Sequence, residues 1–161
     1  MKLKLSDDII SPSDVKSVIE QLNDYAKQLR SVSIKKRVTD KHVPIDTKLA
    51  PAASFVLDNF LNGQAPTADD VEHLVIQLND YLKNSLQLRL ILADIPPLKL
   101  KRDIVHWCRN HLGNEVLIDF RFSPTLLGGM VVVSGSHIYD WSWRRMILEN
   151  KSKFAEAMRS V

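Results

Sequence analysis

Apolar residues in the first half of the chain recur every three or four positions, the spacing of one face of an α-helix. The first such stripe predicts a helix with Ser11 or Ser13 as its N-terminal cap. Its apolar positions are Val15, Val18, Ile19, Leu22, Tyr25, Ala26 and Leu29. The polar and basic stretch 31–50 is predicted mostly as a connection, because it contains Pro44 and proline interrupts a helix.

Two more helices are predicted before residue 84. The first spans residues 52–62, with Gly63 as its C-terminal stop. Its expected apolar contacts are Phe55, Val56, Phe60 and Leu61. The second spans residues 69–82 and follows Thr67, a residue type that caps helix N-termini. The first half of the chain is therefore expected to form a helical domain.

The helix predicted over 69–82 repeats the first helix at a fixed offset. Asp14-Val15 recurs as Asp70-Val71, and the sequence Gln-Leu-Asn-Asp-Tyr at 21–25 recurs at 77–81. A duplicated helical unit would produce this match, and so would the common composition of amphipathic helices. Both explanations remain open.

After Asn84 the periodicity changes to the alternation of strands. Residues 86–93 and 115–122 are predicted as strands, and the Pro96-Pro97 pair opens a helix over 98–111. A β-hairpin and a helix from Trp143 to about residue 160 complete the order β-α-β-β-β-α. The fold class is thus predicted as α+β, with a helical domain over 1–84 and a small α+β domain over 85–161.

The hairpin is the most strongly patterned part of the chain. Gly128 and Gly129 allow positive φ before a run of valines, and Gly135-Ser136 is placed as a two-residue hairpin turn. Asp140 and Ser142 precede the last helix and are interpreted as its N-terminal cap. The residues that define this motif are Pro124, Leu127, Gly128, Gly129, Gly135, Asp140 and Ser142.

This segment resembles the C-terminal signature of the F-type ATP synthase delta subunit family, called OSCP in mitochondria. The shared order is Pro-x-Leu-Leu-Gly-Gly, an apolar strand, a glycine-containing turn and Asp-x-Ser before a basic helix start. Ser123 stands where the family has an acidic residue, and Trp141 stands where it has glycine. The family begins with a six-helix bundle, so this chain resembles a short or divergent member.

The resemblance implies a non-catalytic stator subunit that links the catalytic head to the peripheral stalk. The N-terminal helices would bind the N-terminal segment of the alpha subunit, and the C-terminal domain would bind the helices of the stalk's b subunit. Membrane contact would come only through these partners, at the cytoplasmic face of the plasma membrane. The candidate partner contacts are Val71, Leu74, Leu78, Trp141, Trp143, Arg144 and Arg145. For the two tryptophans, packing in the core or capping of a sheet edge is favoured over a place in an interface.

The charge distribution leaves a second function open. The net charge is +3, but residues 1–83 carry 11 Lys and Arg against 12 Asp and Glu, whereas residues 84–161 carry 11 against 7. This basic second half, with Phe120, Phe122 and the two tryptophans near strands, would suit a small RNA-binding module. Neither the aromatic ribonucleoprotein signature nor a Gly-x-x-Gly loop is present. Nucleic acid is therefore the alternative partner, not the expected one.

Enzymatic and metal chemistry find little support in the sequence. His106, Cys108 and His111 share one predicted helix, but His106 is two residues from Cys108 and no fourth ligand is evident. No phosphate-binding loop is present, and Gly128-Gly129 precedes a strand, not a helix. The sequence therefore predicts no enzyme activity, no cofactor and no metal. No stretch is apolar for long enough to predict a membrane span.

Overall fold

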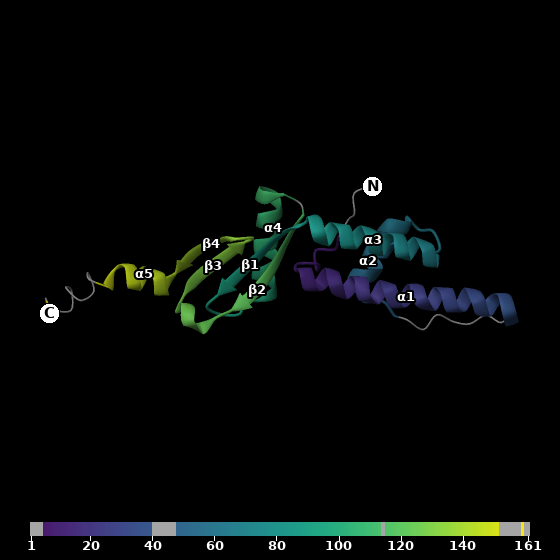
Figure 1. Cartoon of the computed structure of the whole chain (residues 1–161), viewed down its shortest axis with the longest axis horizontal. Coiled ribbons are helices and arrows are strands. Elements are labelled where there is room, and N and C mark those ends of the chain that lie inside the picture. Colours follow the sequence, from purple (N-terminus) through teal and green to yellow (C-terminus); the bar gives the residue numbers. More distant parts are fainter. Residues whose placement is uncertain (1–4, 40–47, 114, 152–158, 160–161) are drawn as a thin grey trace. The chain divides into compact units, whose positions relative to one another are not determined.

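The computed structural model describes residues 5–39, 48–113, 115–151 and 159, and it combines helices with a mixed four-stranded sheet. The predicted α+β class is confirmed at this level. The chain divides into two compact units, Met1–Ser85 and Leu86–Val161, called unit 1 and unit 2 (Figure 1). No helix in the described residues is long and apolar enough to cross a lipid bilayer.

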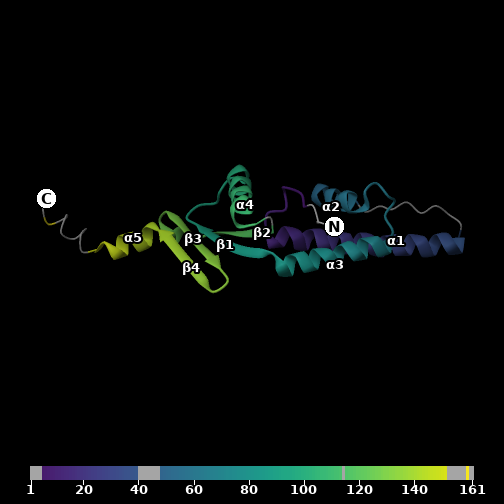
Figure 2. The same cartoon turned by 90° about the horizontal axis from the view of Figure 1, so that it is seen from above.

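Unit 1 contains three helices within its described residues: α1 (Pro12–Thr39), α2 (Pro51–Leu61) and α3 (Ala68–Asn84). The α1 and α3 helices pack along one another, and both contact α2 (Figure 2). The side chains sealed between these helices are Val15, Val18, Leu22, Ala26, Ala53, Val56, Leu57, Val71, Leu74 and Leu78. The apolar stripe predicted for the first helix supplies most of the α1 contribution.

The α1 helix extends beyond its predicted end. Residues 31–39 are helical, not a connection, because no proline or glycine occurs before Pro44, which itself lies outside the described residues. This extension carries no apolar stripe, and Ile34 is exposed. Periodicity could not reveal it, since a solvated helix needs no apolar face.

The structure decides between the two predicted caps of α1 and corrects the predicted apolar contacts of α2. Ser11 is the cap: its Oγ accepts from the Asp14 backbone N–H at 3.3 Å, and Asp14 Oδ2 accepts from the Ser11 N–H at 2.8 Å. In α2, Phe55 is exposed and Phe60 is only half-buried, whereas Ala53 and Leu57 join the core. The buried face of α2 is therefore rotated from the predicted one.

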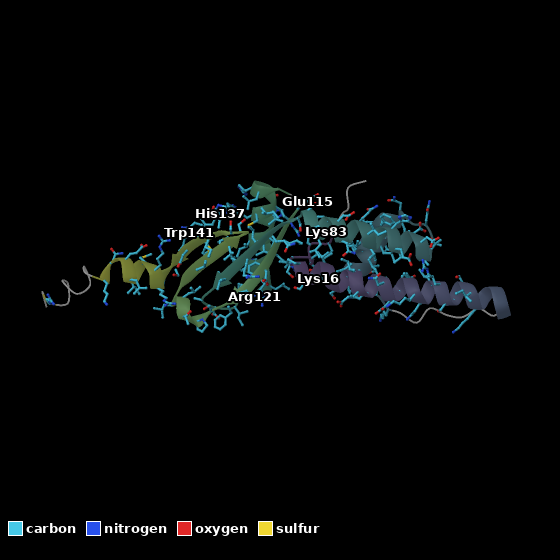
Figure 3. The ribbon with its side chains drawn as sticks, viewed as in Figure 1. Lys16, Lys83, Glu115, Arg121, His137 and Trp141 are labelled. Atoms are coloured by element: carbon cyan, nitrogen blue, oxygen red, sulfur yellow. The ribbon has the colours of Figure 1, made fainter. Side chains whose placement is uncertain are left out.

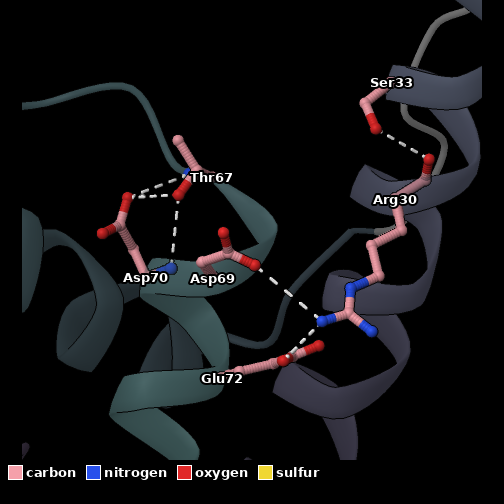
Figure 4. Close-up of polar contacts among 6 residues, drawn as sticks. All are labelled: Arg30, Ser33, Thr67, Asp69, Asp70 and Glu72. Carbon is pink, nitrogen blue, oxygen red and sulfur yellow. Dashed lines mark hydrogen bonds and ion pairs between the residues drawn. The ribbon is translucent and has the colours of Figure 1, made fainter.

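The N-terminus of α3 is fixed by polar contacts (Figure 4). Thr67 Oγ1 accepts from the Asp70 N–H at 3.2 Å, and Asp70 Oδ2 accepts from the Thr67 N–H at 3.3 Å, which completes a capping box. Arg30 of α1 reaches the same turn, with its Nη2 2.6 Å from Glu72 Oε2 and 3.8 Å from Asp69 Oδ1. The predicted cap at Thr67 is confirmed.

Unit 2 is built around the sheet, whose strand order is β2-β1-β3-β4. Strand β1 pairs in parallel with β2 and antiparallel with β3, which continues into the hairpin with β4. The elements are β1 (Leu86–Leu92), α4 (Leu98–Leu112), β2 (Val116–Phe122), the short 3₁₀ turn η1 (Pro124–Leu126), β3 (Gly129–Ser134), β4 (His137–Ser142) and α5 (Trp143–Glu149). Residues 152–158 and 160–161 of the last predicted helix lie outside the described residues.

The register of the sheet separates its residues into two faces. Leu90 pairs with Phe120 on one side and with Val132 on the other, and Val132 pairs with Tyr139. Directly paired residues share a face, and successive residues of a strand alternate between faces. Leu90 and its partners therefore lie on one face, which we call the groove face. Arg89 and its partners lie on the other, which we call the arginine face.

The positive φ predicted at the start of the hairpin is confirmed for Gly129 and wrong for Gly128. Positive φ angles occur at Leu127 (62°) and Gly129 (75°), and Gly128 is not among the positive-φ residues. Gly128 instead must be small, because a Cβ there would lie 2.5 Å from the Trp143 ring. At the hairpin tip, Gly135 has a φ of 56°, as a glycine in the first central position of a type II′ turn has.

Candidate functional site

Unit 2 has a cavity of about 830 Å³ on the groove face. Leu88, Leu90, Ile118 and Val132 form its floor. One wall is α4, and the other is β4 with its neighbour β3. The lining is almost entirely apolar, and most of the large side chains along its rim are accessible to solvent. We call this feature the apolar groove.

Each wall of the apolar groove carries a pair of stacked rings. On α4, the Trp107 and His111 rings have centroids 4.4 Å apart. On β4, the Tyr139 and Trp141 rings have centroids 5.9 Å apart and an interplanar angle of 16°. Figure 3 labels Trp141 and His137, which lie on the same strand. The groove is thus flanked by exposed aromatic side chains, which are the residues most often decisive in protein interfaces.

The local sequence explains both walls. On β4, residues 137, 139 and 141 share the groove face because strand positions alternate. On α4, Ile104, Trp107, Cys108 and Leu112 follow helical spacing and all line the groove. Of these wall residues, Cys108 was considered from the sequence, as a metal ligand, and the others were not singled out. Its helical spacing was visible there, but which side of the sheet the helix covers depends on tertiary packing.

Polar groups near the groove are few and do not form a catalytic arrangement. Asp103, Ser134 and His137 are the polar residues of its lining. Burial raises the pKa of the Cys108 thiol, so this side chain is a protonated, apolar part of the wall and not a thiolate nucleophile. The arrangement can bury an apolar surface, but these residues do not assemble an acid, a base and a nucleophile.

The candidate metal ligands are directed to other partners. His111 Nδ1 lies 2.8 Å from the Trp107 carbonyl oxygen, and His106 Nε2 lies 3.4 Å from Asn110 Nδ2. Cys108 faces the apolar groove. Within the ranges that the structure describes, no group of three His, Cys, Asp or Glu side chains is placed to hold a metal ion.

Both tryptophans are exposed, so the expectation of core packing is wrong, whereas Trp141 does lie on an edge strand. Trp141 is 56% exposed and Trp143 is 57% exposed. Trp141 stands on the edge strand at the rim of the groove, and Trp143 is the first residue of α5, where its ring covers Gly128. Residues two apart in a strand share a face, but Trp143 lies beyond the end of β4.

The two arginines predicted as contacts differ in their surroundings. Arg144 is exposed, whereas Arg145 donates from Nε to Glu149 Oε1 at 2.6 Å and from Nη1 to the Asp140 carbonyl oxygen at 3.3 Å. Arg145 therefore ties the first turn of α5 to β4. Arg144 is the one of this pair that faces solvent without such a tie.

The three aliphatic candidates on α3 are not surface residues. Val71, Leu74 and Leu78 have no exposed surface, because they fill the space between α3 and the other helices of unit 1. The expectation that they contact a partner is corrected: an amphipathic stripe does not distinguish a stripe filled within the chain from one left for a partner. The large apolar side chains of the described part of unit 1 that remain exposed are Ile34, Phe55 and Ile76.

The junction between β4 and α5 is closed by a second capping arrangement. Ser142 is the N-cap of α5, with its Oγ accepting from the Arg145 N–H at 3.2 Å. Asp140 Oδ1 accepts from the Ser142 N–H at 2.8 Å. Hydrogen bonds from the Ser142 side chain and backbone, together with the nearby arginines, lower the pKa of Asp140. Of the two residues predicted as caps, Ser142 caps the helix, whereas Asp140 accepts a hydrogen bond from the Ser142 backbone.

The aromatic residues considered for RNA binding lie mainly along the groove face. Phe120 and Phe122 pair with Leu90 and Leu92, which places them on that face. Lys101 Nζ lies 5.8 Å from the centroid of the Phe120 ring, so one side of this ring already faces a cation from α4. Phe122 and Trp141 stand on opposite edge strands and form no continuous stacking platform.

Comparison with known proteins adds no family: no protein-family model matches this chain, and no curated protein matches it.

Proposed function

We propose that this chain is a non-catalytic stator subunit of an F-type ATP synthase, and that the apolar groove of unit 2 receives a helix of the peripheral stalk. The observation that supports this most is the place of the segment that resembles the delta subunit family. Its two strands, β3 and β4, supply one wall of the groove through Met130, Tyr139 and Trp141, and Val132 of β3 contributes to the floor. The part of the sequence that resembles a stator subunit is therefore the part that faces the cavity.

The chemistry of the groove suits an amphipathic helix. A helix can insert apolar side chains at i, i+3, i+4 and i+7 into an apolar groove while its polar face stays in water. The exposed rings of Trp107 and Trp141 on opposite walls would contact such a helix from both sides. Few polar groups would be left without partners, so little desolvation cost opposes the contact.

The order of elements in unit 2 is also consistent with this proposal. The family has an apolar strand, a proline-started helix and a second strand before Gly-Gly, and β1, α4 and β2 precede Gly128 here. In unit 1, contact with the alpha subunit would fall to exposed side chains such as Phe55 and Ile76, since Leu78 and its neighbours are buried. As part of this complex, the chain would lie at the cytoplasmic face of the plasma membrane and reach the membrane only through its partners.

The proposal is tested by purifying the tagged full chain from the cells that produce it and identifying what accompanies it. ATP synthase subunits are the expected partners, and nucleic acid as the main companion would contradict the proposal. The groove is tested by the double variant Trp107→Ser/Trp141→Ser, which removes one ring from each wall. We expect at least about tenfold weaker binding of the stalk subunit, because loss of an aromatic hot spot costs about 2 kcal/mol or more.

A matched control uses the other face of the same strand. Ile138 is the neighbour of residues 137 and 139 on β4, is 68% exposed and lies on the arginine face. Ile138→Ser should leave binding of the stalk subunit within about twofold, as expected for a side chain outside the contact. Equal losses in both variants would show that the groove is not the binding site.

A further inference from the structure

The arginine face of the sheet carries a cluster of three charged side chains. Arg89 on β1 is directly paired with Asp119 on β2, and Arg121 follows two positions later on β2. Arg89 donates from Nε to Asp119 Oδ2 at 3.3 Å, and Arg121 donates from Nε to the same oxygen at 2.9 Å. Figure 3 labels Arg121 on this strand. One carboxylate oxygen therefore holds two guanidinium groups.

The charges of this cluster do not balance. Two arginines face one aspartate, so the cluster keeps one uncompensated positive charge. The side chains of Arg89 and Arg121 are 56% and 63% exposed. Within the described residues, no charged or polar partner is shown for the Nη groups of either arginine. These groups are the donors that bind carboxylates in a bidentate manner.

A purely structural role does not account for the second arginine. An exposed ion pair stabilises a fold by about 0–1 kcal/mol. A single arginine paired with Asp119 would already provide this stabilisation. The second arginine brings a like charge close to the first, which opposes that gain. An incoming carboxylate would relieve the repulsion and use the remaining Nη donors.

Apolar side chains continue the same row of the sheet. Arg89 pairs with Val133 on β3, and Val133 pairs with Ile138 on β4. With strands about 4.8 Å apart, Ile138 lies about 10 Å from Arg89 across the face. Ile138 is strongly exposed. A partner on this face would thus meet guanidinium groups at one side and an apolar side chain at the other.

We propose that the arginine face binds an acidic segment of a partner protein, with carboxylates on Arg89 and Arg121 and an apolar side chain on Ile138. The site is separate from the apolar groove and does not depend on the function proposed for it. A nucleic acid fits less well, because the exposed rings of Tyr139 and Trp141 lie on the opposite face and no base could stack on them from here.

The test measures binding of labelled probes to the full chain by fluorescence anisotropy. One probe is a twelve-residue peptide that alternates Glu pairs with Leu, a second replaces every Glu with Gln, and a third is a single-stranded uridine oligonucleotide of about equal length. We expect the acidic peptide to bind and the Gln peptide to bind at least about tenfold more weakly. Added salt should weaken binding of the acidic peptide.

The variants separate this site from general attraction to a basic protein. Arg89→Gln/Arg121→Gln should weaken binding of the acidic peptide about tenfold. The control Lys99→Gln/Arg144→Gln removes the same charge elsewhere in unit 2 and should change this affinity less than about threefold. Asp119→Asn removes the competing carboxylate and should tighten binding several-fold.

Three outcomes would overturn the proposal. Equal weakening by the two double variants would show diffuse attraction, and unchanged or weaker binding by Asp119→Asn would show that this carboxylate does not compete with a ligand. Tighter binding of the oligonucleotide than of the acidic peptide would show that nucleic acid is the ligand of this surface.

Discussion

The two units differ in what covers the apolar faces of their helices. In unit 1 the apolar faces of α1, α2 and α3 are filled by one another, so that Val71, Leu74 and Leu78 have no exposed surface. In unit 2, α4 lines one side of an open groove, and Trp107 and Trp141 stay exposed on its walls. The first arrangement stabilises a fold, whereas the second leaves apolar surface exposed to solvent.

The charged clusters of the two units show the same contrast. In unit 1, Arg30 lies between two acids, Asp69 and Glu72, and connects α1 with α3. In unit 2, Asp119 lies between two arginines on neighbouring strands, which the sheet already holds together. The first cluster joins elements, and the second adds positive charge to a surface. Burial and charge balance therefore separate structural residues from candidate contacts better than residue type does.

The largest effect is expected from a charge placed in the closed core of unit 1. Leu78→Asp should unfold unit 1, because truncating a buried leucine costs about 2–5 kcal/mol and burying a carboxylate adds to this cost. Ile76→Asp, on the exposed side of the same helix, should change stability by less than about 0.5 kcal/mol. Hydrogen exchange followed by NMR would report each unit. Loss of protection in unit 2 alone would contradict the expectation.

A smaller loss of stability is expected from Gly129→Val at the start of β3. This residue has a φ of 75°, and a Cβ there would overlap the Trp141 carbonyl oxygen. The strained backbone alone costs about 1–3 kcal/mol, so the melting temperature of unit 2 should fall. Gly135→Asn is the control, since Gly135 also has positive φ but has open space around it and asparagine tolerates this region. Similar losses for both variants would show that the overlap with Trp141 is unimportant.

Removing the cap between β4 and α5 should reduce the free energy of unfolding by less than Gly129→Val does. Ser142→Ala deletes the oxygen that accepts from the Arg145 N–H, and loss of such a cap costs about 0.5–2 kcal/mol. Ser136→Ala in the exposed hairpin turn removes a hydroxyl of the same kind without a cap. Denaturant unfolding of the two variants compares them directly. A Ser136→Ala loss as large as that of Ser142→Ala would argue against the capping role.

The smallest expected effect is a dependence of stability on acid pH. The folded state lowers the pKa of Asp140 below its ordinary value of 3.8, mainly through hydrogen bonds from Ser142. A lowered folded pKa stabilises the fold above pH 3.8, and this contribution disappears as the pH falls through the folded pKa. The melting temperature of Asp140→Asn should therefore lie slightly below that of the wild type at pH 5 and approach it near pH 2. A constant difference across this range would rule out the titration.

Local features of the fold could be predicted because their causes are local. Thr67 and Ser142 cap helices through hydrogen bonds to residues three positions away, and Gly135 turns a hairpin between adjacent strands. The extension of α1 to Thr39 could not be predicted from periodicity, because an exposed helix needs no apolar stripe. The positive φ at Leu127 was also missed, since glycine is the residue type expected there.

The candidate site was harder to predict because it depends on which elements meet. Trp141 was singled out from the sequence, but its exposure follows from its place on an edge strand beyond the reach of α4. Trp107 was not singled out, because its place opposite Trp141 appears only when α4 packs against β2, at the other edge of the sheet. Leu78 was assigned to a partner although α1 fills the space beside it. Sequence patterns identify apolar faces, whereas tertiary packing decides what covers them.

The direct passage from β4 into α5 has a mechanical consequence. Ser142 is both the last residue of the strand and the N-cap of the helix, so no slack chain separates the two (Figure 1). A pull on α5 along the strand direction would load the β3–β4 ladder in shear. The backbone hydrogen bonds of an antiparallel pair run across the strands, so all the paired positions from Gly129–Ser142 to Ser134–His137 would resist together and not break one after another. The direct junction would therefore couple α5 to the whole β3–β4 ladder under such a load.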